Sequence, residues 1–206
     1  MGAGVRLVVA TTNPDKLREI RGIIRVPGVV LVGLEACPPV AEPEETGSTF
    51  AENARQKAVY YSNALGLVVV AEDSGLEIDG LGGEPGVQSA RYGGPAAVTY
   101  PQKWALVYAG LRARGAMGGP ARFVCALAVA DGPRVLFEAR GTIEGRVNDA
   151  PAGEGGFGYD PIFFYPPLNR TLAQLGEAEK AAVSHRGQAF RLLRERLAAD
   201  PSFLRR

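Results

Sequence analysis

Residues Leu67–Gly94 have the sequence LVVVAEDSGLEIDGLGGEPGVQSARYGG. The stretch begins with an apolar, β-branched run, which is typical of a buried strand in a parallel or mixed sheet. This run leads to two adjacent carboxylates, Glu72 and Asp73, and then to a Ser-Gly pair that predicts a turn. Acids at the carboxyl end of such a strand lie at the sheet edge where α/β proteins bind ligands. Because adjacent buried charges need a partner, we expect a cation beside them, either Arg91 or a hard metal ion such as Mg²⁺.

The segments on both sides alternate between strand and helix patterns, so the chain is predicted to adopt an α/β fold. A first strand at Arg6–Ala10 is followed by a helix from Pro14 to about Ile24, with Asn13 as its N-cap. The remaining expected elements are a strand at Val29–Gly33, a helix opened by a capping box of Thr49 and Glu52, a helix at Thr99–Arg114, a hairpin of Ala121–Ala130 and Arg134–Ile143, and a last helix after Ser184.

Composition restricts the classes of protein that the chain can represent. Its 206 residues suit a single domain covering residues 1–206. The net charge of +1 argues against broad electrostatic binding to nucleic acid. The sequence has no apolar run long enough to span a bilayer and no basic-then-apolar leader, so we expect a cytoplasmic protein with no membrane partner. Cys37 and Cys125 lie far apart without a CxxC pattern, which predicts free thiols rather than a zinc site.

The strand–turn–helix at Val8–Arg18 is a candidate anion site, because the N–H groups of a helix N-terminus attract phosphate. Lys16 lies on the first turn of this helix. Only four of the 23 basic residues are lysines, which suggests that lysine stands where a compact ammonium is needed. An ordinary capped helix with a solvated lysine is the alternative, and the GxxxxGK[ST] pattern of a P-loop is absent.

A second group of acids, Glu44 and Glu45, precedes the helix that the capping box opens. Together with Glu72 and Asp73 they supply enough oxygen ligands for Mg²⁺, with one carboxylate left over as a general base. Solvated loop acids and a structural ion pair with Arg91 are the alternatives.

Two segments near the C-terminus are further candidates for ligand contacts. The glycine-rich run Gly153–Asp160 allows close approach of the backbone, with Phe157 or Tyr159 as a stacking surface. A structural turn with core aromatics is the commoner use of such a run. Further on, His185 and Arg186 place cations in the first turn of the last helix, against its dipole, which suggests acceptors opposite them.

Taken together, five co-linear segments resemble the inosine triphosphate pyrophosphatase family. They are ATTNPDKLREI (Ala10–Ile20), EETGSTFAENARQKA (Glu44–Ala58), AEDSGLEIDGLGGEPGVQSARYGG (Ala71–Gly94), GEGGFGYDPIFF (Gly153–Phe164) and EKAAVSHRGQAFRLL (Glu179–Leu193). The resemblance implies an elongated α/β fold with a central mixed sheet flanked by helices, two lobes around a nucleotide-binding cleft, and a homodimer. It implies Mg²⁺-dependent hydrolysis of ITP, dITP and XTP to the nucleoside monophosphate and pyrophosphate, which removes these nucleotides from the pool.

The resemblance also implies a role for each matched residue. Asp73 matches the general base, and Glu44, Glu45, Glu72 and Asp73 match the metal-binding acids. The residues that match phosphate contacts are Thr11, Thr12, Asn13, Lys16, Lys57 and Ser74. Those that match the pocket for the purine are Phe157, Gly158, Tyr159, Asp160, Lys180, His185 and Arg186. Lys103 falls in no matched segment, and we expect it on the surface.

Where the family usually has Gly and Asp, this chain has Thr12 and Glu72, so which acid binds the metal directly stays open. Two other functions also remain possible. A nucleotide sensor on the same scaffold would bind ITP without turnover. A related pyrophosphatase for modified pyrimidine nucleotides would share the chemistry and differ in the base pocket.

Overall fold

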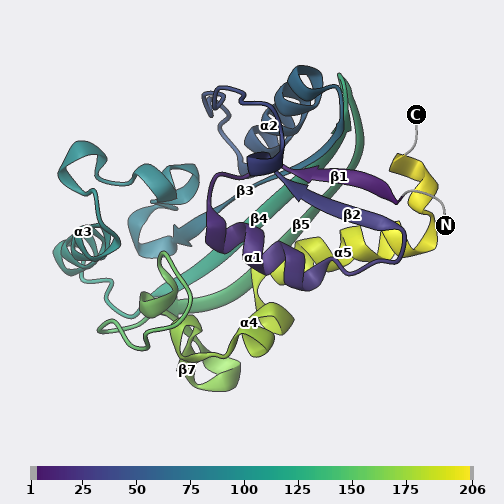
Figure 1. The fold of residues 1–206 in the computed structure, drawn as a ribbon. Coiled ribbons are helices and arrows are strands. Elements are labelled where there is room, and N and C mark those ends of the chain that lie inside the picture. The colour runs from purple at the N-terminus through teal and green to yellow at the C-terminus, as the bar shows by residue number, and fades with distance from the viewer. Residues whose placement is uncertain (1–3, 205–206) are drawn as a thin grey trace. The chain divides into compact units, whose positions relative to one another are not determined.

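The computed structural model describes residues 4–204, and Figure 1 shows the fold. Within these residues seven strands form one sheet, in the order β2-β1-β3-β4-β5-β6-β7. The strands span Val5–Val9 (β1), Val29–Gly33 (β2), Val68–Ile78 (β3), Pro120–Asp131 (β4), Arg134–Val147 (β5), Phe163–Tyr165 (β6) and Arg170–Thr171 (β7). The α-helices span Pro14–Ile23 (α1), Phe50–Leu65 (α2), Tyr100–Ala113 (α3), Glu177–Val183 (α4) and His185–Ala199 (α5).

The sheet is mixed, as predicted. Strand β1 runs parallel to both β2 and β3, whereas β6 runs antiparallel to its neighbours β5 and β7. Strands β4 and β5 are neighbours joined by a two-residue connection, so they form the expected hairpin. The α/β class predicted from the sequence is therefore confirmed.

The chain divides into two compact units, which are described separately below. Unit 1 contains the described residues up to Asp73, together with Cys125–Gly141 and the described residues from His185 onward. Unit 2 contains Ser74–Val124 and Thr142–Ser184. Strands β3, β4 and β5 each contribute residues to both units. The single domain and the cleft between two lobes stay predictions.

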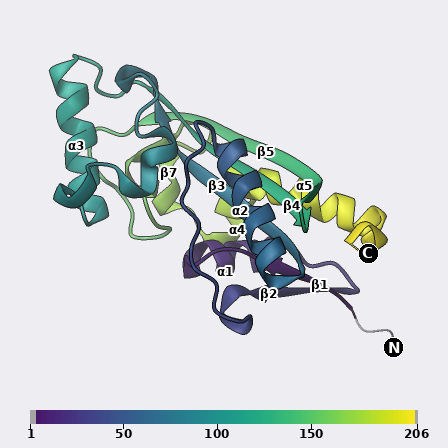
Figure 2. The same cartoon turned by 90° about the horizontal axis from the view of Figure 1, so that it is seen from above.

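In unit 1 the sheet has helices on both faces. Helices α1 and α5 lie side by side on one face and α2 covers the other, as the two perpendicular views in Figures 1 and 2 show. Buried aliphatic side chains of β1, including Leu7 and Val8, lie in the core with Ile20 of α1 and Phe190 of α5. Each fully buried side chain of this size stabilises the fold by about 1.5–3 kcal/mol.

The sequence signals that begin the first two helices are confirmed in detail. The Asn13 side chain accepts hydrogen bonds from the backbone N–H groups of Asp15 and Lys16 at the start of α1. Thr49 and Glu52 form the reciprocal capping box of α2. Capping of this kind contributes about 1 kcal/mol per helix, so these starting points are fixed locally.

The turn expected at Ser74-Gly75 is wrong, because β3 continues without interruption to Ile78. Gly75 allows this strand to pass close to another segment of unit 2. A Cβ atom at Gly75 would lie 2.3 Å from the hydroxyl of Ser89, which accepts a hydrogen bond from the Leu76 N–H. The glycine therefore marks a close crossing of two segments and not a reversal of the chain.

Unit 2 has its own hydrophobic core, which includes Leu76, Leu111, Phe163 and the ring of Tyr159. The surface position expected for Lys103 is wrong, because its side chain is buried against this unit. Its ammonium donates a hydrogen bond of 2.6 Å to the carbonyl of Ala97, so the charge is satisfied within the fold.

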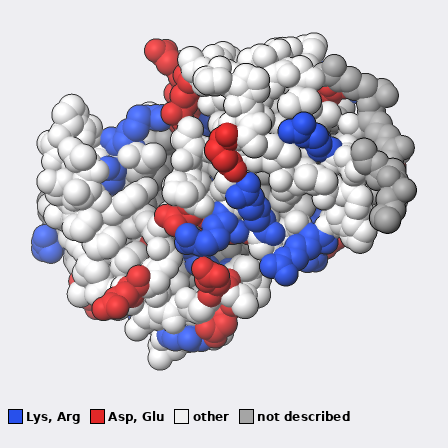
Figure 3. Space-filling view, viewed as in Figure 1, with Lys and Arg blue, Asp and Glu red and all other residues white. Residues whose placement is uncertain are grey.

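Charged side chains on the surface form local pairs. On α1, Arg18 contacts Asp15 at 2.8 Å, and Arg21 contacts Glu35 at the same distance. Figure 3 shows that basic and acidic side chains lie close to one another on the face it presents. Among the described residues, no helix combines the length and apolar character needed to cross a bilayer.

Candidate functional site

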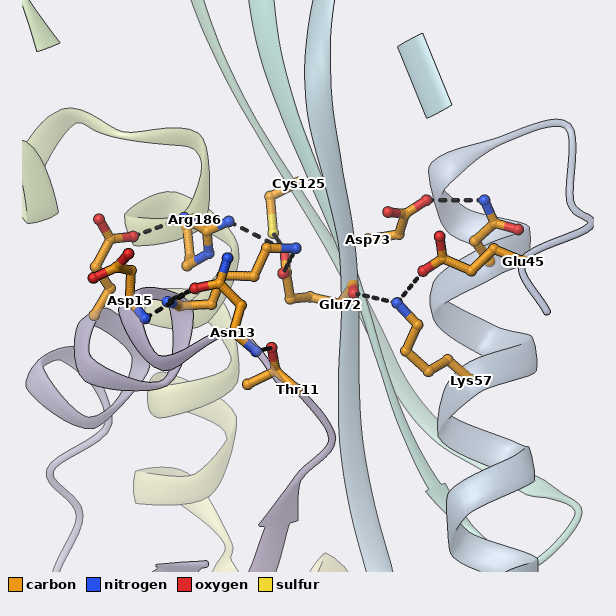
Figure 4. A network of polar contacts seen from close by, with 12 residues as sticks. Thr11, Asn13, Asp15, Glu45, Lys57, Glu72, Asp73, Cys125 and Arg186 are labelled. Carbon is orange, nitrogen blue, oxygen red and sulfur yellow. Dashed lines mark hydrogen bonds and ion pairs between the residues drawn. The ribbon is translucent and has the colours of Figure 1, made fainter. Parts of the chain in front are cut away.

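Glu72 and Asp73 are consecutive residues of β3, and their side chains point to opposite faces of the sheet, as alternation along a strand requires. Figure 4 shows Glu72 on the side of Arg186, and Asp73 on the side of Glu45 and Lys57. The last β1 residue, Val9, pairs with Val70 of β3. Both acids therefore lie just beyond the point where β1 leaves the sheet.

On the face covered by α1 and α5, Glu72 forms the centre of a buried ionic network. Its carboxylate lies 2.5 Å from the Lys16 ammonium and 3.5 Å from the Arg186 guanidinium. Arg186 also contacts Glu19 of α1 at 2.7 Å, and the Cys125 thiol donates to Glu72 at 3.3 Å. A cation was expected beside Glu72, with Arg91 or a metal ion as the candidates, and the structure places Lys16 and Arg186 there instead. The acceptors expected opposite the first turn of α5 are Glu19 and Glu72.

The electrostatics of this network keep Glu72 charged. Burial by itself raises the pKa of the Glu72 carboxyl, but the charges of Lys16 and Arg186 outweigh burial and hold the pKa well below its usual value. The same carboxylate, together with burial, raises the pKa of the Cys125 thiol, which therefore stays protonated. At neutral pH Glu72 is therefore an anion that holds Lys16 in place.

The loop at the start of α1 offers fewer free N–H groups than the sequence predicted. Those of Asp15 and Lys16 already donate to Asn13, and the Asn13 N–H donates to the Thr11 hydroxyl at 3.1 Å. A pocket of about 480 Å³ opens beside this loop, lined by Thr11, Thr12, Asn13, Pro14, Leu17, Leu34 and Glu35. Anion binding here would depend on the Lys16 ammonium and on side chains more than on the helix amides.

On the α2 face, Lys57 connects two of the acidic segments. Its ammonium pairs with the carboxylate of Glu45 and donates to the backbone carbonyl of Glu72 at 3.4 Å. Burial lowers the pKa of Lys57, but the hydrogen bond and charge of Glu45, with the charges of Glu72 and Asp73, more than compensate and leave the pKa raised. Lys57 therefore remains a cation between the acids.

Asp73 has the opposite electrostatics to Glu72. Burial, together with the negative charges of Glu45 and Glu72, raises the pKa of Asp73 to about 6, even though the hydrogen bond from Asn53 and the charge of Lys57 lower it. The Asn53 amide donates to the Asp73 carboxylate at 2.9 Å. A carboxylate with a pKa near neutrality can accept a proton and later release it.

The structure separates the two glutamates that precede α2. Glu45 is half-buried and pairs with Lys57, whereas Glu44 is exposed. Among the described residues, no group of three or more His, Cys, Asp or Glu side chains is arranged to hold a metal ion. On the α2 face the carboxylates of Glu45 and Asp73 are the available pair, while Glu72 is engaged on the other face.

The glycine-rich segment belongs to unit 2, where it surrounds a buried ion pair. The Lys180 ammonium lies 2.5 Å from the Asp160 carboxylate and 4.6 Å from the centre of the Phe157 ring. The Phe157 N–H also donates to Asp160 at 2.8 Å. Gly156 has φ +67°, and a Cβ atom there would lie 2.2 Å from the Asp160 carboxylate, so glycine is required at this position.

Of the two aromatic rings expected to stack on a ligand, one belongs to the core. Tyr159 is 3% exposed, and its hydroxyl donates to the carbonyl of Ser89 at 2.9 Å. Phe157 remains half-buried. The indole N–H of Trp104, on α3, donates to the carbonyl of Gly158 at 3.0 Å and ties the glycine-rich segment to that helix.

The other predicted site residues lie as follows. Ser74 is half-buried at the start of the unit 2 part of β3. His185 is buried at the start of α5, where a Cβ atom on Gly141 would lie 2.1 Å from the His185 carbonyl. Gly141 thus permits α5 to begin directly against β5.

Sequence reasoning missed Glu19, Asn53 and Trp104. Asn53 carried a signal, because it interrupts the apolar face of α2 between Phe50 and Ala54, and an amide on such a face needs partners. Glu19 looked like an ordinary helix-surface acid. The bond of Trp104 to a backbone carbonyl of a distant segment could not be read from helical spacing.

Comparison with known proteins gives consistent matches over nearly the whole chain. The model of the Ham1 family matches residues 7–196. A dITP/XTP pyrophosphatase of Thermus thermophilus is 46% identical over 202 residues, which cover 96% of this chain and 94% of the relative. Another of that name, from an Exiguobacterium species, is 44% identical over 189 residues, or 92% of this chain and 95% of the relative. The solved structure of a HAM1 protein from Coxiella burnetii is 37% identical and superimposes with a TM-score of 0.85, covering 95% of this chain and 99% of that one.

The fold and site define an α/β protein in which two adjacent acids on one strand of a mixed sheet point to opposite faces, where helices supply Lys16 on one face and Lys57 on the other. The family match and the identity of the relatives over most of their length confirm the resemblance found in the sequence. The chain belongs to the Ham1 family.

Proposed function

We propose that the protein hydrolyses the non-canonical purine nucleoside triphosphates dITP, ITP and XTP to the monophosphate and pyrophosphate. The observation that carries this proposal is Asp73, a buried carboxyl with a pKa raised to about 6 that is held beside Glu45 and Lys57. A relative that is 46% identical in sequence over 96% of this chain is named dITP/XTP pyrophosphatase. The enzyme is thus a hydrolase that acts on a phosphoanhydride bond.

The residues on the α2 face fit a hard divalent cation. Glu45 and Asp73 provide carboxylate oxygens, and Mg²⁺ commonly takes one or two protein carboxylates and completes its coordination with substrate phosphates and water. Burial is the largest cause of the raised pKa of Asp73, and the negative charges of Glu45 and Glu72 add to it, so a bound cation would offset part of the cost of ionising this carboxyl. Mg²⁺ bound there would neutralise phosphate charge and lower the pKa of the attacking water.

Side chains of the protein would supply the proton transfer and the stabilisation of the leaving group. Asp73 takes a proton from water as the water oxygen bonds to the α-phosphorus, and the bond from that phosphorus to the bridging oxygen breaks to release pyrophosphate. Lys16 and Lys57 offset the charge on the departing group. Glu72 orients Lys16 through the 2.5 Å contact. Direct metal binding by Glu44 or Glu72 stays a prediction.

Base selection is proposed for the glycine-rich segment of unit 2. Phe157 offers its ring for stacking, and Lys180, held by Asp160, offers N–H donors to the O6 acceptor of hypoxanthine or xanthine. Adenine has an amino donor at that position, and facing a buried ammonium it would leave polar groups unpaired. Contacts of His185 and Arg186 with the purine stay predictions.

A substrate panel tests the proposed function. With Mg²⁺, we expect ITP, dITP and XTP to yield monophosphate and pyrophosphate, with much slower turnover of ATP, GTP and dUTP, and with chelation of the metal stopping the reaction. Ion-exchange chromatography identifies the products. Orthophosphate as the sole released phosphate would contradict the proposal, and preferred turnover of dUTP would move the enzyme to the pyrimidine-specific class. Saturable binding of ITP without turnover at any Mg²⁺ concentration would make it a sensor.

The only tryptophan of the chain is a built-in reporter of base binding. Because the Trp104 indole bonds to Gly158, we expect its fluorescence emission to shift when ITP is added in EDTA, whereas inorganic tripolyphosphate leaves the emission unchanged. Trp104→Phe removes one hydrogen bond and should raise KM for ITP about 3- to 10-fold with little change in kcat. An equal response to tripolyphosphate would show that the indole does not report on the base.

Homodimer formation and a cytoplasmic location are proposed from the family resemblance. Val98, Leu106 and Met117 of unit 2 have exposed apolar side chains, and a second copy that covered them would remove apolar area from water.

A further inference from the structure

The buried side-chain amide of Asn53 connects two acidic segments that are far apart in the sequence. Its NH₂ group donates to the Asp73 carboxylate on β3 at 2.9 Å, and its carbonyl accepts the backbone N–H of Gly47 at 2.7 Å. Gly47 is two residues after Glu45. Asn53 is 1% exposed, so water does not compete for these bonds.

The arrangement requires an amide on one side and a glycine on the other. Only a side chain with both a donor and an acceptor can serve a carboxylate and an N–H group together. A Cβ atom at Gly47 would lie 2.6 Å from the Asn53 carbonyl oxygen and 2.8 Å from the Glu52 side chain, so the loop reaches Asn53 because it has no side chain at that point. Asn53 itself is fixed by α2, which the capping box of Thr49 anchors.

We propose that Asn53 is a positioning residue that sets the separation of Glu45 and Asp73, and so forms the divalent-cation site. The amide holds the Asp73 carboxylate in one orientation, and through Gly47 it fixes the backbone that carries Glu45. Lys57 lies one helical turn after Asn53 on α2, and its ammonium pairs with the Glu45 carboxylate, so α2 contacts this loop at two points. This inference rests on the proposed function, because it concerns the same two carboxylates.

The most informative substitutions are Asn53→Ala, which removes both bonds without adding a charge beside the carboxylates, and Gly47→Ala, which breaks the same contact from the loop side. Asn63→Ala is the matched control, because Asn63 lies on the same helix, is exposed, and undergoes the same chemical change.

The test measures Mn²⁺ binding to the metal-free protein by electron paramagnetic resonance, together with kcat and KM for ITP. We expect Asn53→Ala and Gly47→Ala to weaken Mn²⁺ binding and lower kcat about 10- to 100-fold, with the smaller change in KM, and Asn63→Ala to match the wild type. In an Asp73→Asn background, Asn53→Ala should have no more than a small further effect on Mn²⁺ affinity.

Wild-type Mn²⁺ affinity in folded Asn53→Ala or Gly47→Ala would overturn the inference, even if the thermal midpoint fell, because a merely structural role shifts stability and leaves the metal site intact. If Asn53→Ala does not fold, Gly47→Ala decides by itself. Failure of the proposed function is seen separately, as a wild-type protein that binds Mn²⁺ but does not split ITP between the α- and β-phosphates.

Discussion

Asp73→Asn is expected to lower kcat by about 10²- to 10⁴-fold, the contribution of a general base in a positioned site, while the protein becomes more stable at neutral pH. The loss of activity follows because an amide cannot take a proton from water. The fold should persist, since asparagine at this position keeps an oxygen that can accept the hydrogen bond from Asn53. Product release measured by chromatography gives the first quantity.

The gain in stability follows from the sign of the pKa shift. Burial raises the folded-state pKa of Asp73 to about 6, above that of an unfolded aspartate, so the folded state holds a proton more tightly. The stability of the wild type therefore decreases as the pH rises from about 4 to about 6, and above that range the buried charge costs roughly 2–3 kcal/mol. Asp73→Asn removes this cost above pH 6, and the two proteins should converge near pH 4.

Urea unfolding in EDTA at pH 4 and pH 8 measures this difference. Asp149→Asn is the control, because Asp149 is exposed and should change neither activity nor stability. Full turnover by Asp73→Asn would show that another group is the general base. A lower stability of this variant than of the wild type at pH 8 would show that the buried Asp73 charge does not destabilise the fold.

Arg186→Met is expected to have the largest effect on stability, a loss of about 3–5 kcal/mol at pH 7, because removing one partner leaves a buried charge without compensation. Arg186 is 2% exposed and contacts both Glu72 and Glu19. The pKa of Glu72 is held low in the folded wild type, so its stabilising contribution is present above the unfolded pKa and is lost as the pH falls. The deficit of the variant should therefore shrink below pH 4.

Two variants test this interpretation by urea unfolding. Arg55→Met breaks the exposed pair with Glu138 and should cost at most about 1 kcal/mol. Arg186→Met combined with Glu72→Gln should recover part of the loss, because the unpaired charge is removed as well. If the double variant were no more stable than the single one, the effect would come from lost packing and not from charge.

The features that the sequence predicted correctly depend on neighbouring residues. Asn13 before Pro14 and the pair of Thr49 and Glu52 define helix starts through bonds within one turn, so their residues alone suffice. The strand at Val29–Gly33 and the β4–β5 hairpin follow in the same way from local pattern and turn chemistry. The family resemblance then ordered these elements along the chain.

The features that the sequence did not predict depend on contacts between distant segments. Ser74-Gly75 looks like a turn until Ser89 is seen to cross the strand there. Lys103 looks like a surface lysine, but its buried ammonium donates a hydrogen bond to the carbonyl of Ala97. The opposite orientation of Glu72 and Asp73 follows from simple alternation, but only once β3 is known to continue past them.

This alternation limits how the protein can change in length. The side-chain period of a strand is two residues, so the insertion or deletion of one residue in the β3 segment before Glu72 would exchange the two acids. The base would then meet Lys16 and Arg186, and the anchor of Lys16 would face Asn53. Substitutions in the Val68–Val70 segment can preserve the enzyme if they remain apolar. Any change of its length by an odd number of residues would instead turn each of the two acidic side chains to the opposite face of the sheet.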